Sequence, residues 1–381
     1  MSKLVIIGTG LAGYTLAREI RKRDSESELL LITRDDGSSY SKPMLSNALG
    51  KDKHPDALVI SSAEQMAETL AAEIWTRTRV NRIDTRHQAL HTEKGVASYT
   101  KLVLANGANT IMAPIKGGAA NKILSVNDLD DYRLFRAELE KGKRVVIIGA
   151  GLIGCEFAND LSTVGADISV VDLASRPLGS LLPEKASSLL QEKLSELGIN
   201  WHLNNAVNSV ETSDEGLRVT LKDSTVITAD IVLSAIGLRP NLELATEAGI
   251  ETDRGLKVDR FMQTSHENIY GLGDCAQIED LTLPFVMPLM NSARALAATL
   301  CGEDTAVCYP AMPVVVKTPC YPVVVCPTPR PKEGHWEEEI TDEGVRALFR
   351  DNDGNIAGFA LTGELVREKM ALSKQVDDWL A

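Results

Sequence analysis

A glycine-rich turn occurs twice in this chain, and each copy stands in the same local context. Residues 3–19 read KLVIIGTGLAGYTLARE, and residues 144–160 read RVVIIGAGLIGCEFAND. In both copies a run of branched apolar residues predicts a strand, the spacing Gly-x-Gly-x-x-Gly predicts a tight turn, and the residues that follow favour a helix. One such motif is weak evidence, because similar turns occur in βαβ units that bind nothing. Two copies in this context indicate two dinucleotide-binding units.

The three glycines of each copy have separate tasks in such a unit. The first permits the turn, the second lets the backbone approach a pyrophosphate, and the third lets the helix pack closely on the strand. Free N–H groups at the helix start then bind the diphosphate. The predicted binding residues are Gly8, Thr9, Gly10, Leu11, Ala12 and Gly13 in the first copy, and Gly149, Gly151, Leu152, Ile153 and Gly154 in the second.

The residues after each turn differ, and the difference concerns the ribose. The strand after the second copy ends in Asp172, whose carboxylate can accept hydrogen bonds from a ribose 2′-hydroxyl and would repel a 2′-phosphate. No arginine stands at residues 173–175, so we expect NADH to be preferred over NADPH. Thr33, Arg34 and Asp35 stand at the corresponding place after the first copy, and the sequence leaves open which of them binds the ribose.

Each unit also has a later strand that runs into a glycine turn. These strands lie in residues 101–108 and 230–241, the second with Gly237 at its turn. Residues 268–276 read NIYGLGDCA and place Asp274 between a strand end and a helix start, where a carboxylate can hold sugar-alcohol hydroxyls. Because this motif follows the second unit, we expect the second unit to be inserted into the first.

As a set, these motifs resemble the two-dinucleotide flavoprotein reductases of the glutathione reductase fold. The resemblance implies an α/β chain with two Rossmann-like domains, the first for FAD and the second for NAD(P)H, and a small C-terminal α+β domain. It also implies that Gly273 and Asp274 contact the ribitol of FAD. The usual Ala-Thr-Gly of this family reads Ala105-Asn106-Gly107 here, and the amide of Asn106 can still form hydrogen bonds with backbone.

The segment SSYSKPMLSNALG, residues 38–50, indicates the branch of the family. Disulfide reductases carry a Cys-x4-Cys pair here and the oxidase branch carries one cysteine, whereas this segment has none, so we expect no thiol chemistry at the flavin. The segment is similar to the Arg/Lys-Pro-x-Leu-Ser motif of reductases that serve one-electron iron carriers. Its Lys-Pro version and VVVKTPCYP, residues 314–322, most resemble rubredoxin and flavorubredoxin reductases.

This resemblance implies roles for particular side chains. Lys42, Glu156 and Lys317 would surround the flavin as the catalytic groups, because a cation beside the ring stabilises reduced anionic flavin. The lysines are also compatible with ordinary surface positions, and Glu156 with a solvated helix position, but their places beside chain-fixing features favour the functional interpretation. The remaining flavin-binding positions implied are Pro43, Val80 and Val286.

The motif order predicts a domain division. We expect an FAD-binding domain formed by residues 1–108 and 240–311, an NADH-binding domain of residues 109–239 and a C-terminal domain of residues 312–381.

Within the C-terminal domain two local structures are predicted. The proline- and charge-rich residues 327–340 suggest an exposed connection, and the apolar spacing of residues 363–381 favours a packed helix.

Composition restricts the class of protein further. The 381 residues are 44% hydrophobic, and no apolar stretch reaches the roughly 18 residues that would span a bilayer, so we expect no membrane insertion. The net charge of −13 argues against a nucleic-acid partner. Six scattered cysteines form no Cys-x-x-Cys pair and no metal site, and the chain starts directly with a strand, so we expect a cytoplasmic protein without a cleaved leader. A monomer or weak dimer is expected.

The predicted function is NADH-dependent reduction of FAD followed by one-electron transfers to a small iron protein, with rubredoxin as the partner. A reductase for ferredoxin or flavorubredoxin is an alternative of the same class, and a non-catalytic NADH-responsive redox sensor is an alternative of another class. Because rubredoxins are usually acidic like this chain, docking would need a local basic rim. The candidates for this rim are Lys42, Lys51, Lys53, Lys317, Arg330 and Lys332.

Overall fold

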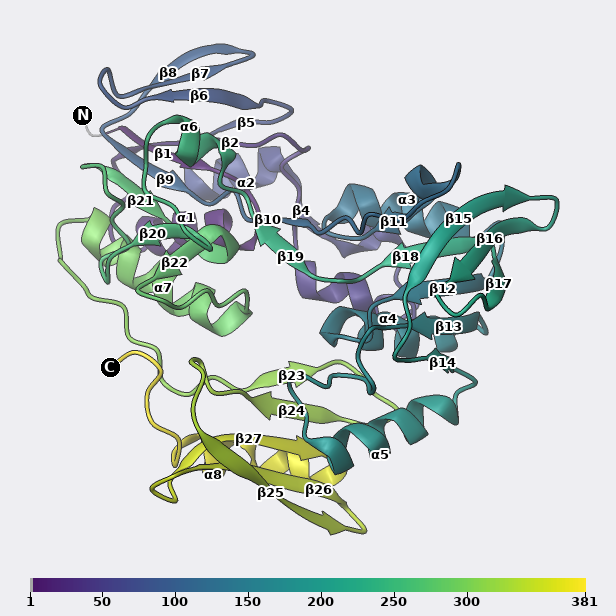
Figure 1. Ribbon diagram of the computed structural model, residues 1–381. Coiled ribbons are helices and arrows are strands. Elements are labelled where there is room, and N and C mark those ends of the chain that lie inside the picture. Colours follow the sequence, from purple (N-terminus) through teal and green to yellow (C-terminus); the bar gives the residue numbers. More distant parts are fainter. Residues whose placement is uncertain (1–2) are drawn as a thin grey trace.

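Two parallel five-stranded sheets and one antiparallel five-stranded sheet form the three main parts of the molecule (Figure 1). The computed structural model describes residues 3–381. The first sheet has the strand order β21-β9-β1-β2-β5, and the second has the order β11-β18-β12-β13-β14. Because the central strand of each sheet leads into a glycine turn, the repeat in the sequence is also a repeat in topology. The predicted pair of Rossmann-like units, called the first unit and the second unit below, is confirmed.

The strands of these sheets are short. The first sheet contains β1 (Lys3–Ile7), β2 (Glu28–Ile32), β5 (Glu73–Trp75), β9 (Lys101–Leu104) and β21 (Ile269–Gly271). The second contains β11 (Leu124–Ser125), β12 (Arg144–Ile148), β13 (Asp167–Val171), β14 (Asn200–His202) and β18 (Ile231–Ser234).

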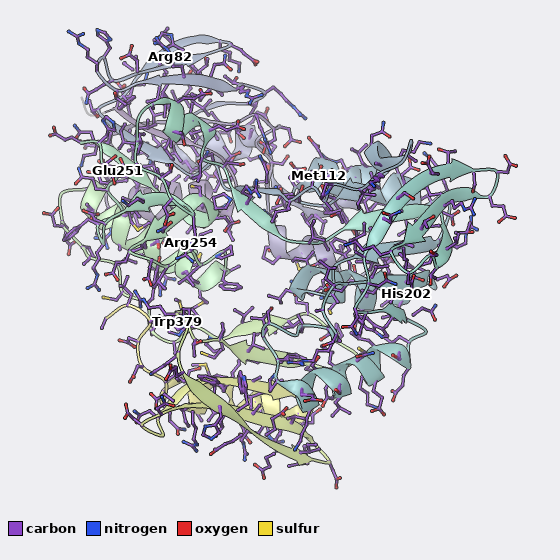
Figure 2. All side chains as sticks on the ribbon, viewed as in Figure 1. Arg82, Met112, His202, Glu251, Arg254 and Trp379 are labelled. Atoms are coloured by element: carbon purple, nitrogen blue, oxygen red, sulfur yellow. The ribbon has the colours of Figure 1, made fainter. Side chains whose placement is uncertain are left out.

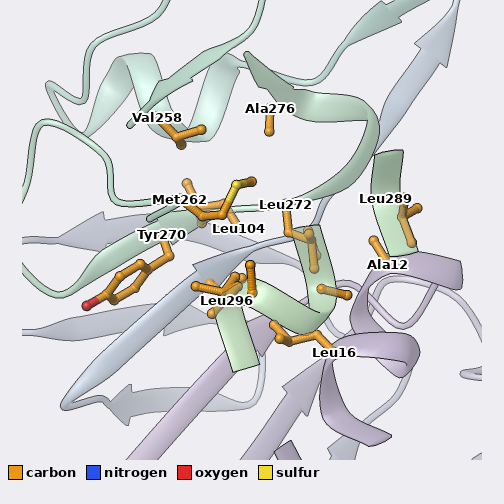
Figure 3. Packing of buried hydrophobic residues seen from close by; sticks show 14 of the residues in the cluster. Ala12, Leu16, Leu104, Val258, Met262, Tyr270, Leu272, Ala276, Leu289 and Leu296 are labelled. Atoms are coloured by element: carbon orange, nitrogen blue, oxygen red, sulfur yellow. The ribbon is translucent and has the colours of Figure 1, made fainter. Parts of the chain in front are cut away.

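Helices cover the parallel sheets, which explains the continuous apolar runs in β1 and β12. In the first unit, α1 (Leu11–Arg21) packs against α7 (Val286–Leu300), and Figure 3 shows Ala12 beside Leu289 in the buried cluster between them. The second unit has α3 (Leu129–Leu139), α4 (Leu152–Ser162) and α5 (Glu184–Ser195). Among residues 3–381, no helix has both the length and the apolar character that crossing a bilayer requires.

Each unit also carries a three-stranded antiparallel meander, which extends the internal repeat. The meanders are β6 (Val80–Asp84), β7 (Ala89–Thr92) and β8 (Gly95–Ser98), and β15 (Val207–Ser213), β16 (Gly216–Leu221) and β17 (Val226–Ala229). Smaller elements are α2 (Ala63–Leu70), α6 (Glu243–Glu247), β20 (Leu256–Val258), β22 (Ala276–Ile278) and the 3-10 turns η3 (Ala120–Lys122) and η4 (Gly273–Cys275).

The chain passes from the first unit to the second and back through two adjacent strands. β10 (Ala108–Thr110) pairs antiparallel with β19 (Leu238–Pro240), and Figure 2 shows Met112 on the link that continues from β10. After β19 the chain returns to the first unit and adds β21 to the edge of its sheet. The division into domains at residues 108 and 239 stays a prediction.

The C-terminal part is an antiparallel sheet with the order β23-β24-β27-β26-β25. Its strands are β23 (Val314–Val316), β24 (Val323–Cys326), β25 (Gly334–Thr341), β26 (Gly344–Asp351) and β27 (Ile356–Thr362). α5 of the second unit packs against β25, β26 and β27.

Two local predictions for this part are wrong. Residues 334–340 of the expected connection 327–340 are exposed but not irregular: they belong to the edge strand β25, because they pair along their length with β26 and Trp336 packs edge-on against Phe349, with ring centroids 5.4 Å apart. The expected helix of residues 363–381 is reduced to the turn η5 (Gly363–Glu368) and α8 (Lys369–Ser373). The tail leaves the helix because Trp379 is buried and its backbone N–H donates to Tyr309 O at 2.6 Å, beside the first unit (Figure 2).

A segment of the first unit packs into the core of the second. This arm, residues 39–58, contains β3 (Ser39–Tyr40), η1 (Lys42–Asn47) and η2 (Pro55–Leu58), and β3 pairs with β4 (Val59–Ser61). The buried side chains of Leu45, Ala48 and Leu49 belong to the hydrophobic cluster that also contains residues of α3 and α4. The arm therefore ties the two units together.

Candidate cofactor site at the junction of the two units

The first glycine of each turn occupies a position that only glycine tolerates. Gly8 has a φ of +112°, and a Cβ there would collide with the carbonyl oxygen of Ala105. Gly149 has a φ of +107°, and its Cβ would lie 2.6 Å from the carbonyl oxygen of Ala235. Ala105 directly follows β9 and Ala235 directly follows β18, so the two turns pack against equivalent points of the two units.

Of the other glycines, the third of each turn is required for packing and the second leaves space for binding. At Gly13 and Gly154 a Cβ would collide with the carbonyl oxygen of the first glycine of the same turn. At Gly10 and Gly151 a Cβ would meet no atom within 4 Å. Gly10 and Gly151 are the N-caps of α1 and α4. At the start of each of these two helices no side chain accepts a hydrogen bond from the first N–H groups, and the first turn has no acidic residue. Open space at free N–H groups fits the diphosphates of two dinucleotides.

Asp172 lies directly at the second turn. Its carboxylate accepts hydrogen bonds from the backbone N–H of Ala150 and, at 2.6 Å, from that of Ala174. The residue is half-buried, and a carboxylate that accepts two hydrogen bonds has acceptor positions left. This placement is compatible with the predicted ribose contact, which stays a prediction.

The three ribose candidates of the first unit differ in environment. Thr33 is buried and its hydroxyl donates to Asp35 Oδ1 at 2.7 Å, whereas Arg34 is exposed. The same Asp35 oxygen accepts from Thr9 of the glycine turn at 3.3 Å. Thr33 is the backbone equivalent of Asp172, because each directly follows the strand whose last carbonyl accepts from the first glycine of its turn. The carboxylate that reaches the first glycine turn, however, is that of Asp35.

The Gly-Asp motif lies over the first helix start. Gly273 has a φ of +81°, and a Cβ there would lie 2.8 Å from the Cβ of Ala12. Asp274 Oδ2 lies 3.9 Å from Lys42 Nζ, which also donates to Asn127 Oδ1 at 2.7 Å. The structure thus brings Lys42 from the arm, Asp274 from the first unit and Asn127 from the second unit to one place.

Glu156 and Lys317 form a second cluster at the junction. Glu156 is buried, and its carboxylate accepts from Lys317 Nζ, from the backbone N–H of Lys317 at 3.0 Å and from Ser46 Oγ at 2.5 Å. Lys317 lies between β23 and β24, so this ion pair joins the second unit, the C-terminal part and the arm. Glu156 is thus a buried ion-pair partner and not the solvated helix residue of the alternative interpretation.

The other predicted positions surround these clusters. Pro43 follows Lys42 in η1, Val80 begins β6 and is half-buried, and Val286 begins α7 with 41% of its surface exposed. Gly107 and Gly237 both have positive φ, +64° and +115°. No contact with a cofactor tests these positions, which stay predictions.

Asn106 uses its amide as the sequence suggested. Its Nδ2 donates to Asn241 O at 3.0 Å, and the Nδ2 of Asn241 donates to Asn106 O at 2.8 Å. This reciprocal pair fixes the point at which the chain returns from the second unit. Buried Ala105 precedes it at the end of β9.

All six cysteines lie in the described part of the chain and are free thiols. Cys155 and Cys275 are buried, and burial raises the pKa of Cys155 strongly and that of Cys275 to about 11. They are therefore protonated and unreactive at neutral pH. Within residues 3–381, no group of three or more histidine, cysteine or acidic residues is arranged to hold a metal ion.

The basic rim expected from the sequence is only partly available. Arg330 pairs with Asp280 at 2.7 Å, and Lys332 pairs with Asp351 at 2.8 Å. Lys317 is the partner of Glu156, whereas Lys51 and Lys53 are exposed. Lys42 lies 3.9 Å from Asp274, so four of the six proposed cations have a neighbouring carboxylate, which charge counting in the sequence does not show.

Comparison with known proteins identifies the family. A family profile described as pyridine nucleotide-disulphide oxidoreductase matches residues 2–297. The chain belongs to this family. A second profile, described as rubredoxin binding C-terminal domain, matches residues 306–376. The cofactors of this family branch are FAD and NADH, in agreement with the two glycine turns.

Relatives within the family match the whole chain. A rubredoxin-NAD(+) reductase of Alcanivorax borkumensis is 48% identical and one of Acinetobacter baylyi is 46% identical, with 98% or more of each chain covered. A protein of Vibrio vulnificus named nitric oxide reductase FlRd-NAD(+) reductase is 37% identical, with 98% of this chain and 97% of the relative covered. The branch predicted from residues 38–50 is confirmed.

Solved structures agree with the fold. A ferredoxin reductase from Rhodopseudomonas palustris has a TM-score of 0.89 at 25% identity, with 99% of this chain and 96% of that chain covered. An NADH:rubredoxin oxidoreductase from Clostridium acetobutylicum has a TM-score of 0.83 at 22% identity, with 98% and 94% covered.

Proposed function

We propose that the protein is an NADH-dependent FAD reductase that transfers electrons to a rubredoxin. The observation that carries this proposal is the junction itself: two free helix N-termini in equivalent turns, with Lys42, Asp274, Glu156 and Lys317 gathered where the units meet. The C-terminal part, which matches a rubredoxin-binding profile, contributes Lys317 to this junction.

The residues of the chain bind and orient the cofactors. The turn at Gly10 and the carboxylate of Asp274 would hold FAD, and the turn at Gly151 with Asp172 would hold NADH. When bound, the two cofactors supply hydride transfer between nicotinamide and flavin and single-electron release to an iron carrier. Lys42 provides positive charge at the flavin side, and Glu156 neutralises and orients Lys317. No cysteine is needed as a nucleophile.

Stopped-flow spectroscopy of the FAD-loaded protein tests this function. NADH should bleach the flavin rapidly, and the reduced protein should then reduce purified rubredoxin faster than ferredoxin, with acceptor-free protein as the control. Slow bleaching with normal FAD and NADH binding would contradict the reductase and favour a redox sensor. Rubredoxin reduction slower than that of ferredoxin would contradict the choice of partner.

A reductase for flavorubredoxin is the second candidate, because the Vibrio vulnificus relative carries that name and covers the same length. Including a flavorubredoxin in the acceptor series decides between the two. We also propose that the protein acts in the cytoplasm as a monomer or weak dimer without a nucleic-acid partner, which its free thiols and net charge of −13 support.

A further inference from the structure

Asp160 on α4 is a buried carboxylate that has no role in the proposed function. Only 4% of its surface is exposed. Its Oδ2 accepts from the backbone N–H of Leu49 at 3.0 Å, and its Oδ1 accepts from that of Gly50 at 2.8 Å. Burial raises the pKa of Asp160, whereas the hydrogen bonds from the amides of residues 48–50 act in the opposite direction. The carboxylate thus accepts from consecutive N–H groups of the arm directly after η1.

The arm is shaped to receive this carboxylate. A Cβ at Gly50 would lie 3.2 Å from Asp160 Oδ1 and 3.3 Å from the methyl group of Thr163, so a larger residue would crowd the contact. Arg136 on α3, whose charge also acts on Asp160, donates to Lys53 O at 2.9 Å. Residues 49–53 of the arm are therefore held from two helices of the second unit.

The contact of Asp160 continues toward the cofactor site along the same helix face. Glu156 precedes Asp160 by four residues on α4, so both side chains project from one face. Glu156 accepts from Ser46 Oγ in the middle of the arm. Lys42 begins the same 3-10 turn and lies beside Asp274. Three points on the arm are thus fixed in the order Gly50, Ser46 and Lys42.

We propose that Asp160 is a positioning residue, which fixes the arm so that Lys42 stays beside Asp274. The inference rests on the proposed function in that Lys42 is taken to face the flavin. Asp160 itself contacts the arm away from Lys42 and acts through the backbone of residues 48–50. Its loss would leave the glycine turns intact and would loosen the lysine.

Hydrogen exchange of the protein without NADH measures the contact directly. Losing a hydrogen bond to a carboxylate should speed exchange of the amides of residues 48–50 by roughly tenfold or more in Asp160→Asn, because the asparagine amide cannot accept both N–H groups. Exchange in residues 42–47 should also rise. Asp214→Asn, on an exposed turn of the same unit, is the matched control and should leave both unchanged. Wild-type exchange throughout the arm of Asp160→Asn would overturn the proposal.

A double-variant cycle then tests whether Asp160 acts through Lys42. Lys42→Met should lower the midpoint potential of bound flavin, and Asp160→Asn should lower it by a smaller amount. In the Lys42→Met background, Asp160→Asn should produce no further shift, whereas an equal shift in both backgrounds would show a general structural effect and refute the inference. If Asp160→Asn does not fold, Gly50→Ala perturbs the same contact from the arm side and should give the same pattern.

The outcomes also separate this inference from the proposed function. An unchanged potential in Lys42→Met would refute the role of Lys42 at the flavin. A shifted potential in Lys42→Met with none in Asp160→Asn would refute the positioning role alone.

Discussion

Replacing Asp172 with alanine tests the nucleotide preference at the second glycine turn. The carboxylate accepts the N–H groups of Ala150 and Ala174 and has acceptor positions left for a ribose 2′-hydroxyl. Losing a hydrogen bond to a charged group costs about 1.5–3 kcal/mol, which corresponds to a loss of roughly ten- to a hundredfold in kcat/KM for NADH. NADPH should lose less, because removal of the carboxylate also removes its repulsion of the 2′-phosphate.

Two further variants isolate the ribose contact from the contact within the turn. Asp172→Asn keeps one oxygen acceptor but no negative charge. Its kcat/KM for NADH should therefore fall less than that of Asp172→Ala, while the ratio of kcat/KM for NADH to that for NADPH still decreases. Asp167→Ala, at the exposed start of the same strand β13, is the matched control and should leave that ratio unchanged.

Steady-state kinetics with both nucleotides and a fixed acceptor gives the comparison. A ribose-binding role of Asp172 is refuted if the wild type uses NADPH as well as NADH. It is also refuted if Asp172→Ala lowers kcat/KM equally for both nucleotides, since this would mean that Asp172 only supports the turn.

Three other predictions concern separate parts of the molecule. Gly154→Ala should abolish NADH binding while FAD stays bound, and Gly13→Ala should prevent FAD loading. In each variant the new Cβ would collide with a backbone oxygen of its own turn. Titration with NADH measures the first effect, and flavin absorbance of the purified protein measures the second. Cys155→Ala should keep acceptor reduction within roughly twofold of wild type, because its thiol is buried and protonated, and lost turnover with flavin bound would contradict this. Raising salt from about 0.1 to 1 M should slow acceptor reduction more than flavin reduction. Lys53→Ala should weaken that salt dependence more than Arg330→Ala, whose guanidinium is already paired, and equal effects would contradict the reduced basic rim.

The parts of the site that the sequence predicted are those with local causes. The turns at Gly8 and Gly149 follow from short motifs, because the strand, the turn and the helix start are adjacent in the chain. Asp172 and Asp274 follow for the same reason, since Asp172 directly follows β13 and Asp274 lies in η4 just after β21. The positive φ at Gly273 and the free cap at Gly151 agree with the tasks that the motifs assigned.

The parts that could not be predicted depend on contacts between distant residues. Asp160 and Leu49 are separated by 111 positions, and nothing in the sequence around either residue shows that they meet. The edge strand β25 could not be predicted because the prolines of residues 327–331 just before it and its own charges suggested a loop, whereas pairing with β26 and the contact of Trp336 decide its conformation. Ion pairs such as Arg330 with Asp280 were missed because charge counting ignores partners.

The position of α4 connects the predicted and unpredicted parts of the site. Gly151 caps the helix where the diphosphate of NADH is proposed to bind, and the helix continues through Glu156 to Asp160. A rise of about 1.5 Å per residue places these three positions at roughly 0, 7.5 and 13.5 Å along one axis. Glu156 holds Lys317 of the C-terminal part, and Asp160 holds the arm that carries Lys42. Because one rigid helix carries all three contacts, a displacement of the nucleotide-binding turn would also move the supports of both lysines. The helix therefore keeps the nicotinamide site and the proposed flavin-side cations in a fixed mutual geometry, which hydride transfer between two separately bound cofactors requires.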